Sequence, residues 1–390
     1  MIIGIVSDTH LGYPRFYDDS FKQFDEAFKG ACDNSDLVIL PGDIFDTKLP
    51  KFEVIAKAMQ SFEYGKQKKW QVKSNTGEGA VVAIHGTHDR RSKEAINPVQ
   101  LLERSGFITN LHDRTIIFEK NGEKVAITGF GGVPEEYAET SLEAFNPKPV
   151  PSAYNILVFH QTILDVIPVA TVGLSLKKMP EGFDLYLCGH IHKRIIMKKH
   201  GKFLLIPGST VITQLKKEET EKKAYVLFDT KTGEPKFVEI NSRPFFHQEL
   251  QLVDADYTLV EKKCREFIES ILEKDLEMPI IKIQVKGKIK SGLKKENIDL
   301  SPIYSEYENK VYLEIDNQLD SDSLKEKMET FRKLYEEKMS VREIGVEILK
   351  KKLADAGQDA SDTHKLFETL SDSKNVDRYL EEVIKKNNKK

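Results

Sequence analysis

The chain has 390 residues, of which 39% are hydrophobic and 31% are charged, and its formal net charge at pH 7 is −3. This composition is typical of a folded globular protein, and the near-neutral charge argues against a simple electropositive nucleic-acid binder. Because a typical domain has roughly 150 residues, the length predicts two or three domains.

The cysteines Cys32, Cys188 and Cys264 are far apart and odd in number. This pattern argues against a disulfide framework and favours a reducing cytoplasm. The apolar residues 1–6 lack a basic stretch before them and are soon followed by Asp8, so they predict a buried strand and not a signal peptide. No apolar run approaches the roughly 18 residues that a membrane-spanning helix needs, so we expect a soluble protein without a membrane partner.

The first half of the chain alternates short apolar runs with amphipathic stretches. The apolar runs predict buried strands at 2–7, 37–40, 81–84, 156–159 and 185–188. Helices are predicted between the early strands, at 21–31 and 52–62. This rhythm indicates a layered α/β domain over residues 1–245, which ends near Pro244.

A smaller β-α-β-β domain is predicted over residues 246–318. Three segments in which polar and apolar residues alternate predict half-buried strands, at 248–253, 281–286 and 311–315. Apolar residues between Val260 and Leu272 recur at helical spacing. Residues 319–390 are highly charged and predict short amphipathic helices, which need the preceding domain or a partner to bury their apolar faces.

Acidic or histidine residues follow five of the predicted strands. The clusters are Ser7-Asp8-Thr9-His10, Gly42-Asp43-Ile44-Phe45-Asp46, His85-Gly86-Thr87-His88-Asp89, Phe159-His160-Gln161 and Gly189-His190-Ile191-His192. One histidine or aspartate after a strand is more often a cap or a satisfied polar group. Five clusters in order favour a metal site, because ligands bind at the carboxyl ends of strands in open α/β sheets.

The chemistry of these clusters suits two metal ions. Imidazole nitrogens mixed with carboxylate oxygens, without thiolates, fit Mn²⁺, Fe or Zn²⁺. The candidates are too many for one ion and fit two ions that share a carboxylate. Two cations roughly 3.5–4 Å apart can hold an attacking hydroxide and stabilise in-line displacement at phosphorus. The sequence has no Gly-x-x-x-x-Gly-Lys-Ser/Thr loop, so we do not expect this chain to hydrolyse ATP.

The clusters resemble the signatures of calcineurin-like metallophosphoesterases, on Asp8-Thr9-His10, Gly42-Asp43, Gly86-Thr87-His88-Asp89, His160 and Gly189-His190-Ile191-His192. Two finer details resemble the meiotic-recombination-eleven/SbcD nucleases. They are Asp8-Thr9-His10-Leu11-Gly12, and Gly189-His190-Ile191-His192-Lys193-Arg194 followed by Ile206-Pro207-Gly208-Ser209-Thr210. The domain order is also similar to that family.

The resemblance implies an α/β fold, a four-layer metallophosphoesterase β-sandwich flanked by helices, with a DNA-capping domain and C-terminal helices. It implies an Mn²⁺-dependent DNA nuclease of a double-strand-break repair complex, with 3′-to-5′ exonuclease and single-strand endonuclease activities. The partners it implies are DNA, a second copy of the chain, and an SMC-like coiled-coil ATPase of the SbcC/Rad-fifty type that binds the C-terminal helices. The compact length is nearer to prokaryotic relatives, with a nucleoid-associated location.

The resemblance also assigns metal ligands, by their positions in the motifs. The resemblance assigns one ion to Asp8, His10 and His192. It assigns the second ion to His160, His190 and Thr87, with Asp43 bridging both.

The resemblance also places His88 beside the scissile phosphate, where it would stabilise developing charge or protonate the leaving oxygen. Asp89 is placed to orient His88 or to cap the next helix. Asp46 lies where some members have a histidine that faces DNA, and we assign it no catalytic role.

The third motif departs from the family pattern, because Thr87 stands where the family has asparagine. A hydroxyl is a weaker and shorter donor than an amide carbonyl. It binds the ion directly, acts through water or does not bind it. We therefore expect looser binding of the second ion.

Two other functions stay open. One is a phosphodiesterase or phosphatase for small phosphoesters, against which the capping domain and the helical tail argue. The other is a DNA-binding scaffold with a decayed metal site, which only Thr87 supports. The basic residues after the last and third motifs either contact DNA phosphates or form a solvated charged face: Lys193, Arg194, Lys198, Lys199, Arg90 and Arg91.

Overall fold

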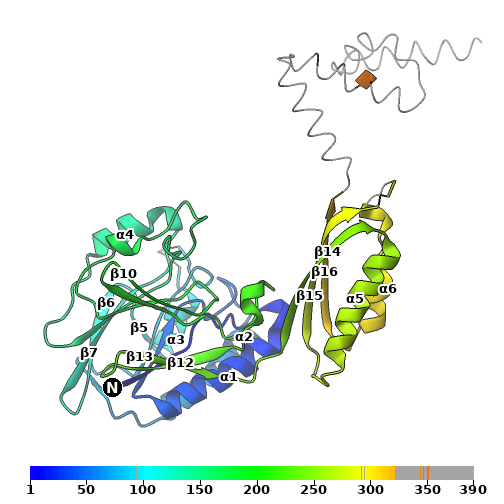
Figure 1. Ribbon diagram of the computed structural model, residues 1–390. Coiled ribbons are helices and arrows are strands. Elements are labelled where there is room, and N and C mark those ends of the chain that lie inside the picture. Colours follow the sequence, from blue (N-terminus) through cyan, green and yellow to red (C-terminus); the bar gives the residue numbers. More distant parts are fainter. Residues whose placement is uncertain are drawn as a thin grey trace, which may run out of the picture. The chain divides into compact units, whose positions relative to one another are not determined.

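The computed structural model describes residues 1–320 except 93, 94, 291 and 294, and in addition 343, 346, 349 and 350 (Figure 1). It divides into two compact units. The first comprises Met1–Gln248, Ser270–Lys282 and Tyr307–Glu314, and the other described residues belong to the second. The helices predicted over 319–390 lie almost wholly outside the described residues. The predicted domain boundaries stay predictions.

Six strands form the first sheet of the first unit. In spatial order they are β13 (Glu234–Glu239), β12 (Ala224–Asp229), β1 (Ile2–Ile5), β2 (Leu37–Pro41), β4 (Val81–Ile84) and β5 (Thr109–Asn110). The strands β1, β2, β4 and β5 are parallel neighbours, whereas β12 runs antiparallel to β1 and to β13. Because β1, β2 and β4 are parallel, their carboxyl ends lie at one edge of this sheet.

Seven strands form the second sheet. In spatial order they are β10 (Ile195–Lys199), β11 (Lys202–Ile206), β9 (Leu185–Cys188), β8 (Tyr154–Phe159), β7 (Glu123–Phe130), β6 (Arg114–Lys120) and β3 (Lys73–Ser74). The strands β7, β8, β9 and β11 are parallel. The five predicted strands that precede the polar clusters are therefore all present, but they are divided between two sheets.

Helices cover the outer faces of the two sheets. The α-helices of the first unit are α1 (Tyr17–Asn34), α2 (Phe52–Gln67), α3 (Pro98–Arg104) and α4 (Ala138–Phe145). Short 3₁₀ helices lie at η1 (Pro14–Phe16), η2 (Glu135–Tyr137), η3 (Leu176–Lys178) and η4 (Lys217–Thr220). The predicted helices at 21–31 and 52–62 correspond to α1 and α2.

Alternating side chains of the strands enter different hydrophobic layers, because successive residues of a strand point to opposite faces. Ile39 of the first sheet and Ile156 and Val158 of the second lie in the layer between the sheets. Leu40 belongs to the cluster formed with α1, α2 and α3, and Leu157 to the cluster formed with α4 and η3. Helix, sheet, sheet and helix thus form four layers, which confirms the predicted fold.

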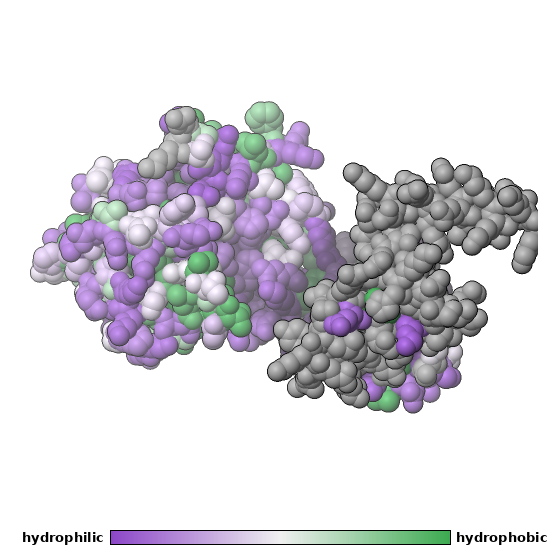
Figure 2. All heavy atoms as spheres, turned by 90° about the horizontal axis from the view of Figure 1, so that it is seen from above, coloured by the Kyte–Doolittle hydropathy of each residue, from purple (hydrophilic) through white to green (hydrophobic). Residues whose placement is uncertain are grey.

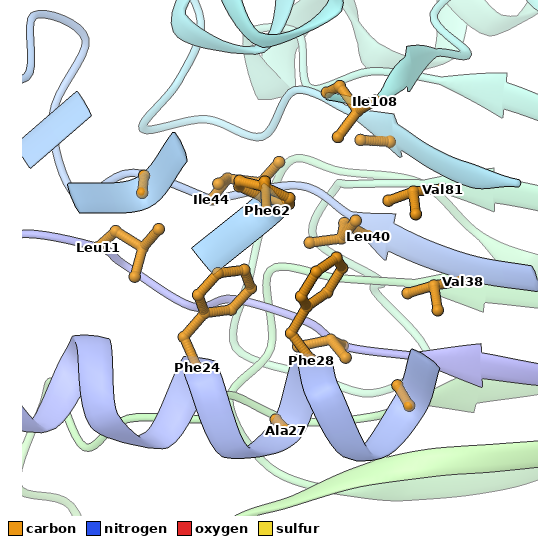
Figure 3. Packing of buried hydrophobic residues seen from close by; sticks show 14 of the residues in the cluster. Leu11, Phe24, Ala27, Phe28, Val38, Leu40, Ile44, Phe62, Val81 and Ile108 are labelled. Carbon is orange, nitrogen blue, oxygen red and sulfur yellow. The ribbon is translucent and has the colours of Figure 1, made fainter. Parts of the chain in front are cut away.

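Aromatic rings fill the layer between the helices and the first sheet (Figure 3). Phe24 and Phe28 of α1 and Phe62 of α2 are fully buried, with ring centroids 5.1–5.3 Å apart. Figure 3 shows these rings in the same cluster as Val38 and Leu40 of β2. These contacts fix α1 and α2 against the sheet whose strand ends carry the polar clusters.

The remaining strands form a separate sheet in the order β14 (Phe245–Ala255), β15 (Ile280–Ile289) and β16 (Tyr312–Asp320). The helices α5 (Tyr257–Leu272), η5 (Lys295–Asn297) and α6 (Ser301–Tyr307) lie between these strands in the chain. The predicted β-α-β-β succession is present, with α6 added. That helix has seven residues, too few for a helical period to stand out in the sequence.

On the face shown in Figure 2, hydrophobic residues form small patches in a mostly hydrophilic surface. Cys32, Cys188 and Cys264 are buried and form no disulfide bond with one another. In the part of the chain that the structure describes, no helix combines the length and the apolar character needed to cross a membrane.

Candidate metal centre

Loops from both sheets meet in one cluster of polar side chains. Asp8 and His10 follow β1, Asp43 follows β2, and Thr87 and His88 follow β4. The second sheet contributes residues that follow β8 and β9, namely His160, His190 and His192. Strand order in each sheet therefore brings together side chains that are far apart in the sequence.

Three of these residues form a first group. One ligand atom each from Asp8, His10 and His192 lies within 4.8 Å of the others. The Nε2 atoms of His10 and His192 are 3.1 Å apart, and His192 Nε2 is 3.9 Å from Asp8 Oδ1. Asp8 is fully buried and His10 nearly so. This is a compact set of two imidazoles and one carboxylate.

A second group lies next to the first. Ligand atoms of Asp43, His160 and His190 lie within 4.8 Å of one another. Asp43 Oδ2 is 3.1 Å from His160 Nε2, and it is also 4.0 Å from His10 Nε2 in the first group. Thr87 Oγ1 lies 3.4 Å from the same oxygen. One oxygen of Asp43 therefore stands between the two groups.

Backbone amides hold the carboxylates in place. The amide of His190 donates to Asp8 Oδ1 at 2.8 Å, and the amide of His88 donates to Asp43 Oδ1 at 2.7 Å. In both cases the loop that carries one candidate ligand also orients another. The amide of His10 in turn donates to the carbonyl of Asp43 at 3.0 Å.

Four candidate ligands have a left-handed backbone. The φ angle is 48° at Asp8, 41° at His10, 47° at Asp43 and 76° at His190. Such φ values are uncommon outside glycine and cost on the order of 1–3 kcal/mol each. This concentration of strain marks the ends of the strands as a functional site.

Two glycines of the motifs allow the loops to approach closely. A Cβ atom at Gly86 would lie 2.1 Å from Asp43 Oδ1. A Cβ atom at Gly42, where φ is +101°, would lie 2.4 Å from His160 Nδ1. Any side chain at these two positions would displace a candidate ligand. The geometry of the site therefore requires glycine at both.

Burial and neighbouring charges shift the pKa values of Asp43, His160 and His190. Burial alone would raise the pKa of Asp43, but His160 and His10 outweigh it and lower that pKa well below its usual range. Burial likewise lowers the pKa of His160, but Asp43 and Asp8 outweigh it and raise that pKa to about 9. The pKa of His190 is lowered to about 4 by burial and by His160.

The donor set fits divalent cations. The two groups together contain two buried carboxylates and four imidazoles, and the Nε2 atoms of His10 and His192 in the first group are 3.1 Å apart. Buried polar groups cost free energy unless they are paired. Mixed nitrogen and oxygen ligands without thiolate suit Mn²⁺, Fe or Zn²⁺.

The exposed ring of His88 lies beside the first group. Its Nδ1 donates to the carbonyl of Asp46 at 2.7 Å, and its ring centroid is 4.8 Å from that of His10. The carboxylate of Asp46 is 3.3 Å from His10 Nδ1. One ligand atom each from His88, His10 and Asp46 also lies within 4.8 Å of the others. Asp46, to which we assigned no role from the sequence, thus contacts two site histidines.

Asp89 has a different role from either of those expected. It is fully buried and accepts hydrogen bonds from the amides of Ile44 at 2.9 Å, Phe45 at 2.8 Å and Gly86 at 3.3 Å. The next helix, α3, is capped by Asn97. Asp89 therefore ties the loop after β2 to the loop after β4.

Sequence reasoning missed the residues that support the last motif. Thr162 lies beside His190, and Thr213 and Glu219 lie beside His192. Glu135 in turn accepts from Thr162. Thr162 and Thr213 lie in loops, whereas Glu135 and Glu219 lie in the short 3₁₀ helices η2 and η4. None of these segments has a periodic pattern, and only the motif at 206–210 pointed to the neighbourhood of Thr213.

Several basic residues near the site have protein partners. Arg194 lies over the ring of Phe237, and Lys199 forms an ion pair of 2.6 Å with Asp165. Lys193 is exposed.

A fold with two stacked sheets and a shared-carboxylate cluster at their strand ends is the architecture of a metallophosphoesterase domain. Residues 1–233 match the family model described as the calcineurin-like phosphoesterase superfamily domain, so the chain belongs to that superfamily.

The chain is also similar to several double-strand break repair proteins. The chain is 30% identical over 308 residues to the double-strand break repair protein MRE11 of Encephalitozoon cuniculi, covering 70% of this chain and 53% of that protein. It is 26% identical to the DNA double-strand break repair protein Mre11 of Archaeoglobus fulgidus, and that match covers 67% of this chain and 64% of that protein. It is 24% identical to the human double-strand break repair protein MRE11, and that match covers 69% of this chain and 46% of that protein. The chain thus spans about half to two thirds of these relatives. The matches confirm the resemblance predicted from the motifs.

Proposed function

We propose that this chain is a two-metal phosphoesterase that cleaves phosphodiester bonds of DNA during double-strand-break repair. One observation carries the proposal: Asp43 Oδ2 lies 3.1 Å from His160 Nε2 and 4.0 Å from His10 Nε2, between two groups of candidate ligands. DNA as the substrate is supported by the relatives, which are double-strand-break repair proteins by name.

In this proposal each group holds one divalent ion. The first ion is held by Asp8, His10 and His192, the second by His160, His190 and Thr87, and Asp43 is shared. When bound, the ions supply a deprotonated water and stabilise charge on the phosphoryl oxygens.

Protein side chains supply proton transfer and positioning. We assign His88 to the scissile phosphate because its ring is exposed at the edge of the cluster. The hydrogen bond from Nδ1 to the carbonyl of Asp46 fixes the ring and leaves Nε2 available. When the ring is protonated at both nitrogens, Nε2 donates to the developing charge or gives its proton to the leaving oxygen.

Thr87 is the weakest ligand of the proposed set. Its hydroxyl donates to Asp43 Oδ2 at 3.4 Å, so binding an ion would compete with this hydrogen bond. We expect Thr87→Asn to tighten one of two calorimetric binding steps for Mn²⁺, because an amide carbonyl reaches further. Unchanged titration curves would show that residue 87 does not ligate.

The finer assignments rest on the resemblance. We propose Mn²⁺ as the working metal, 3′-to-5′ exonuclease and single-strand endonuclease activities, and a homodimer. We also propose a nuclease domain at 1–245, a DNA-capping domain at 246–318, and helices at 319–390 that bind an SMC-like ATPase.

The decisive experiment compares a linear DNA duplex, a circular single strand and bis(p-nitrophenyl) phosphate, each with Mn²⁺, Mg²⁺ or EDTA. We expect Mn²⁺-dependent cleavage of both DNAs, and Asp43→Asn serves as the matched inactive control. Hydrolysis of the chromogenic diester without cleavage of DNA would favour the small-substrate phosphodiesterase. Failure to bind metal would favour the scaffold with a decayed site.

A further inference from the structure

The strand β10 lies at one edge of the seven-stranded sheet and is labelled in Figure 1. It pairs with β11 on one side, and among the described residues no strand pairs with its other side. The strand at the opposite edge, β3, has only two residues, whereas β10 has five. The second sheet therefore has one long open edge, on β10.

The turn between β10 and β11 determines which backbone groups face outward. Lys199 pairs with Lys202 across a two-residue turn in which both φ angles are positive, 52° and 73°. In such a hairpin the residues that flank the turn form a hydrogen-bonded pair, and hydrogen-bonded and non-hydrogen-bonded pairs alternate from there along the strands. The amides and carbonyls of Ile196 and Lys198 therefore point away from β11.

These outward groups have no partner in the part of the chain that the structure describes. There, no other backbone or side-chain group forms a hydrogen bond with the amide or the carbonyl of Ile196 or Lys198. Ile196 is 52% exposed and Lys198 is also exposed, so this edge faces solvent. Unpaired amides and carbonyls on an accessible edge are the template on which an extended peptide adds a strand.

The side chains of this edge define the kind of peptide that fits. Ile196 and Lys198 lie on the same face of β10, because alternate residues of a strand share a face. Within the described residues Lys198 forms no ion pair, whereas neighbouring Lys199 is paired with Asp165 at 2.6 Å. Lys193, just before the strand, is exposed as well. An added strand would thus meet an apolar side chain and an unpaired lysine two residues apart.

A second copy of this chain does not complement that pattern. In a symmetric antiparallel pair of two β10 strands, Lys198 of one copy would lie opposite Lys198, Ile196 or Arg194 of the other. Two of these three registers place cations opposite each other, which destabilises a strand pair, and none offers an acid. An acidic strand satisfies Lys198 and adds no repulsion.

We propose that the outer edge of β10 binds an extended acidic peptide segment of a partner protein, which adds a strand to the second sheet. The peptide backbone forms hydrogen bonds with the outward amides and carbonyls of Ile196 and Lys198. An acidic side chain of the peptide lies opposite Lys198, and an apolar side chain two positions away lies opposite Ile196. This interaction requires neither metal nor DNA, so it stands independently of the proposed function.

Fluorescence anisotropy with the full chain tests the proposal. The probe is the labelled peptide acetyl-Thr-Glu-Val-Val-Val-Glu-Thr-amide, in which the central valine has a glutamate two positions away in both directions. We expect saturable binding, and a loss of affinity of at least ~10-fold when lysines replace both glutamates. The absence of saturable binding to the unaltered chain would overturn the proposal.

Backbone methylation of the peptide tests strand addition itself. Methylation of the amide nitrogen of the central valine removes a donor that faces β10, so it should weaken binding by at least ~10-fold. Methylation of the next amide nitrogen, which faces away from β10, serves as the matched control and should leave the affinity nearly unchanged. Equal effects of the two methyl groups would show that no strand is added.

Variants of the chain test whether β10 is the site. Ile196→Pro removes an outward donor and retains the ladder with β11, since that amide does not bond to β11. This variant and Lys198→Glu should each weaken binding of the glutamate peptide by at least ~10-fold. Lys231→Glu, at an exposed lysine in the turn between β12 and β13, should not change it.

A charge reversal keeps the test valid if Ile196→Pro does not fold. The Lys198→Glu variant should bind the peptide with two lysines more tightly than it binds the peptide with two glutamates. The same preference in Lys198→Glu as in the unaltered chain would refute the proposed pairing with Lys198.

Other occupants of the edge would give different results. A dimer that Ile196→Pro converts to a monomer in sedimentation would identify a second copy as the occupant and overturn the proposal. Weaker binding of a DNA duplex by Lys198→Glu, with peptide binding unchanged, would make β10 a contact for DNA and would overturn it too.

Discussion

At the scale of single residues, the site is built on Asp43. Its Oδ2 faces both groups of candidate ligands, while Oδ1 is occupied by the amide of His88. The motifs predicted these residues from the sequence, because the chemistry requires imidazoles and carboxylates at strand ends. They did not reveal Glu219 or Glu135, since a supporting carboxylate can be provided from any loop that folds close enough.

Removal of the His88 imidazole should separate binding from catalysis. Because its ring only borders the two groups, His88→Ala should bind metal and DNA as before and lose cleavage by ~10²–10⁴-fold. Calorimetry, a DNA-binding titration and single-turnover cleavage measure the three properties. Full cleavage by this variant would contradict the role proposed for His88.

Metal binding should depend on pH through His160. Without metal its pKa is raised to about 9 by Asp43 and Asp8 against the opposing effect of burial, so the ring carries a proton at pH 7. An ion needs the neutral imidazole and must displace that proton. The apparent affinity for Mn²⁺ should therefore rise from pH 6.5 towards pH 9 and then level off.

Calorimetry in two buffers with different heats of ionisation measures the released protons directly. His190 should contribute little to this release, because its pKa is lowered to about 4 and its ring is already neutral. An affinity that is constant between pH 6.5 and 8.5 would contradict the prediction.

At the scale of helices and strands, continuous apolar runs predicted β1, β2, β4, β8 and β9 well, because strands buried on both faces contain few polar residues. Which strands share a sheet could not be predicted. The pairing depends on long-range contacts such as that of β1 with β12, whose partners are more than 200 residues apart in the sequence.

Packing of α1 and α2 on the first sheet should dominate local stability. Phe62 is fully buried between Phe24 and Phe28, so Phe62→Ala should cost ~3–5 kcal/mol in the free energy of unfolding. Phe52 of the same helix is 87% exposed, and Phe52→Ala should change this free energy by no more than ~0.5 kcal/mol. Urea unfolding of both variants makes the comparison. Equal losses would show that burial does not determine the contribution of α2.

At the scale of the whole molecule, the four-layer fold explains why one centre needs residues from five segments of the chain. The first sheet contributes Asp8, His10, Asp43 and Thr87 from adjacent parallel strands, and the second contributes the remaining histidines. The apolar runs alone did not say which sheet each strand belongs to, whereas the resemblance to metallophosphoesterases implied a four-layer sandwich. In the sandwich, the candidate ligands come from two sheets. They meet because loops that follow strands of both sheets lie next to one another.

The predicted C-terminal helices give the last test at this scale. We expect deletion from Val341 onward to abolish binding to an SMC-like ATPase and to leave Mn²⁺-dependent DNA cleavage intact, because every candidate metal ligand lies within residues 8–192. Co-purification with the ATPase and cleavage of a linear duplex provide the two readouts. A truncated chain that still binds the ATPase would place the partner surface elsewhere. A truncated chain that no longer cleaves DNA would show that cleavage itself needs the tail. Cleavage by the destabilised Phe62→Ala variant would then show whether a loss of stability is enough to explain that result.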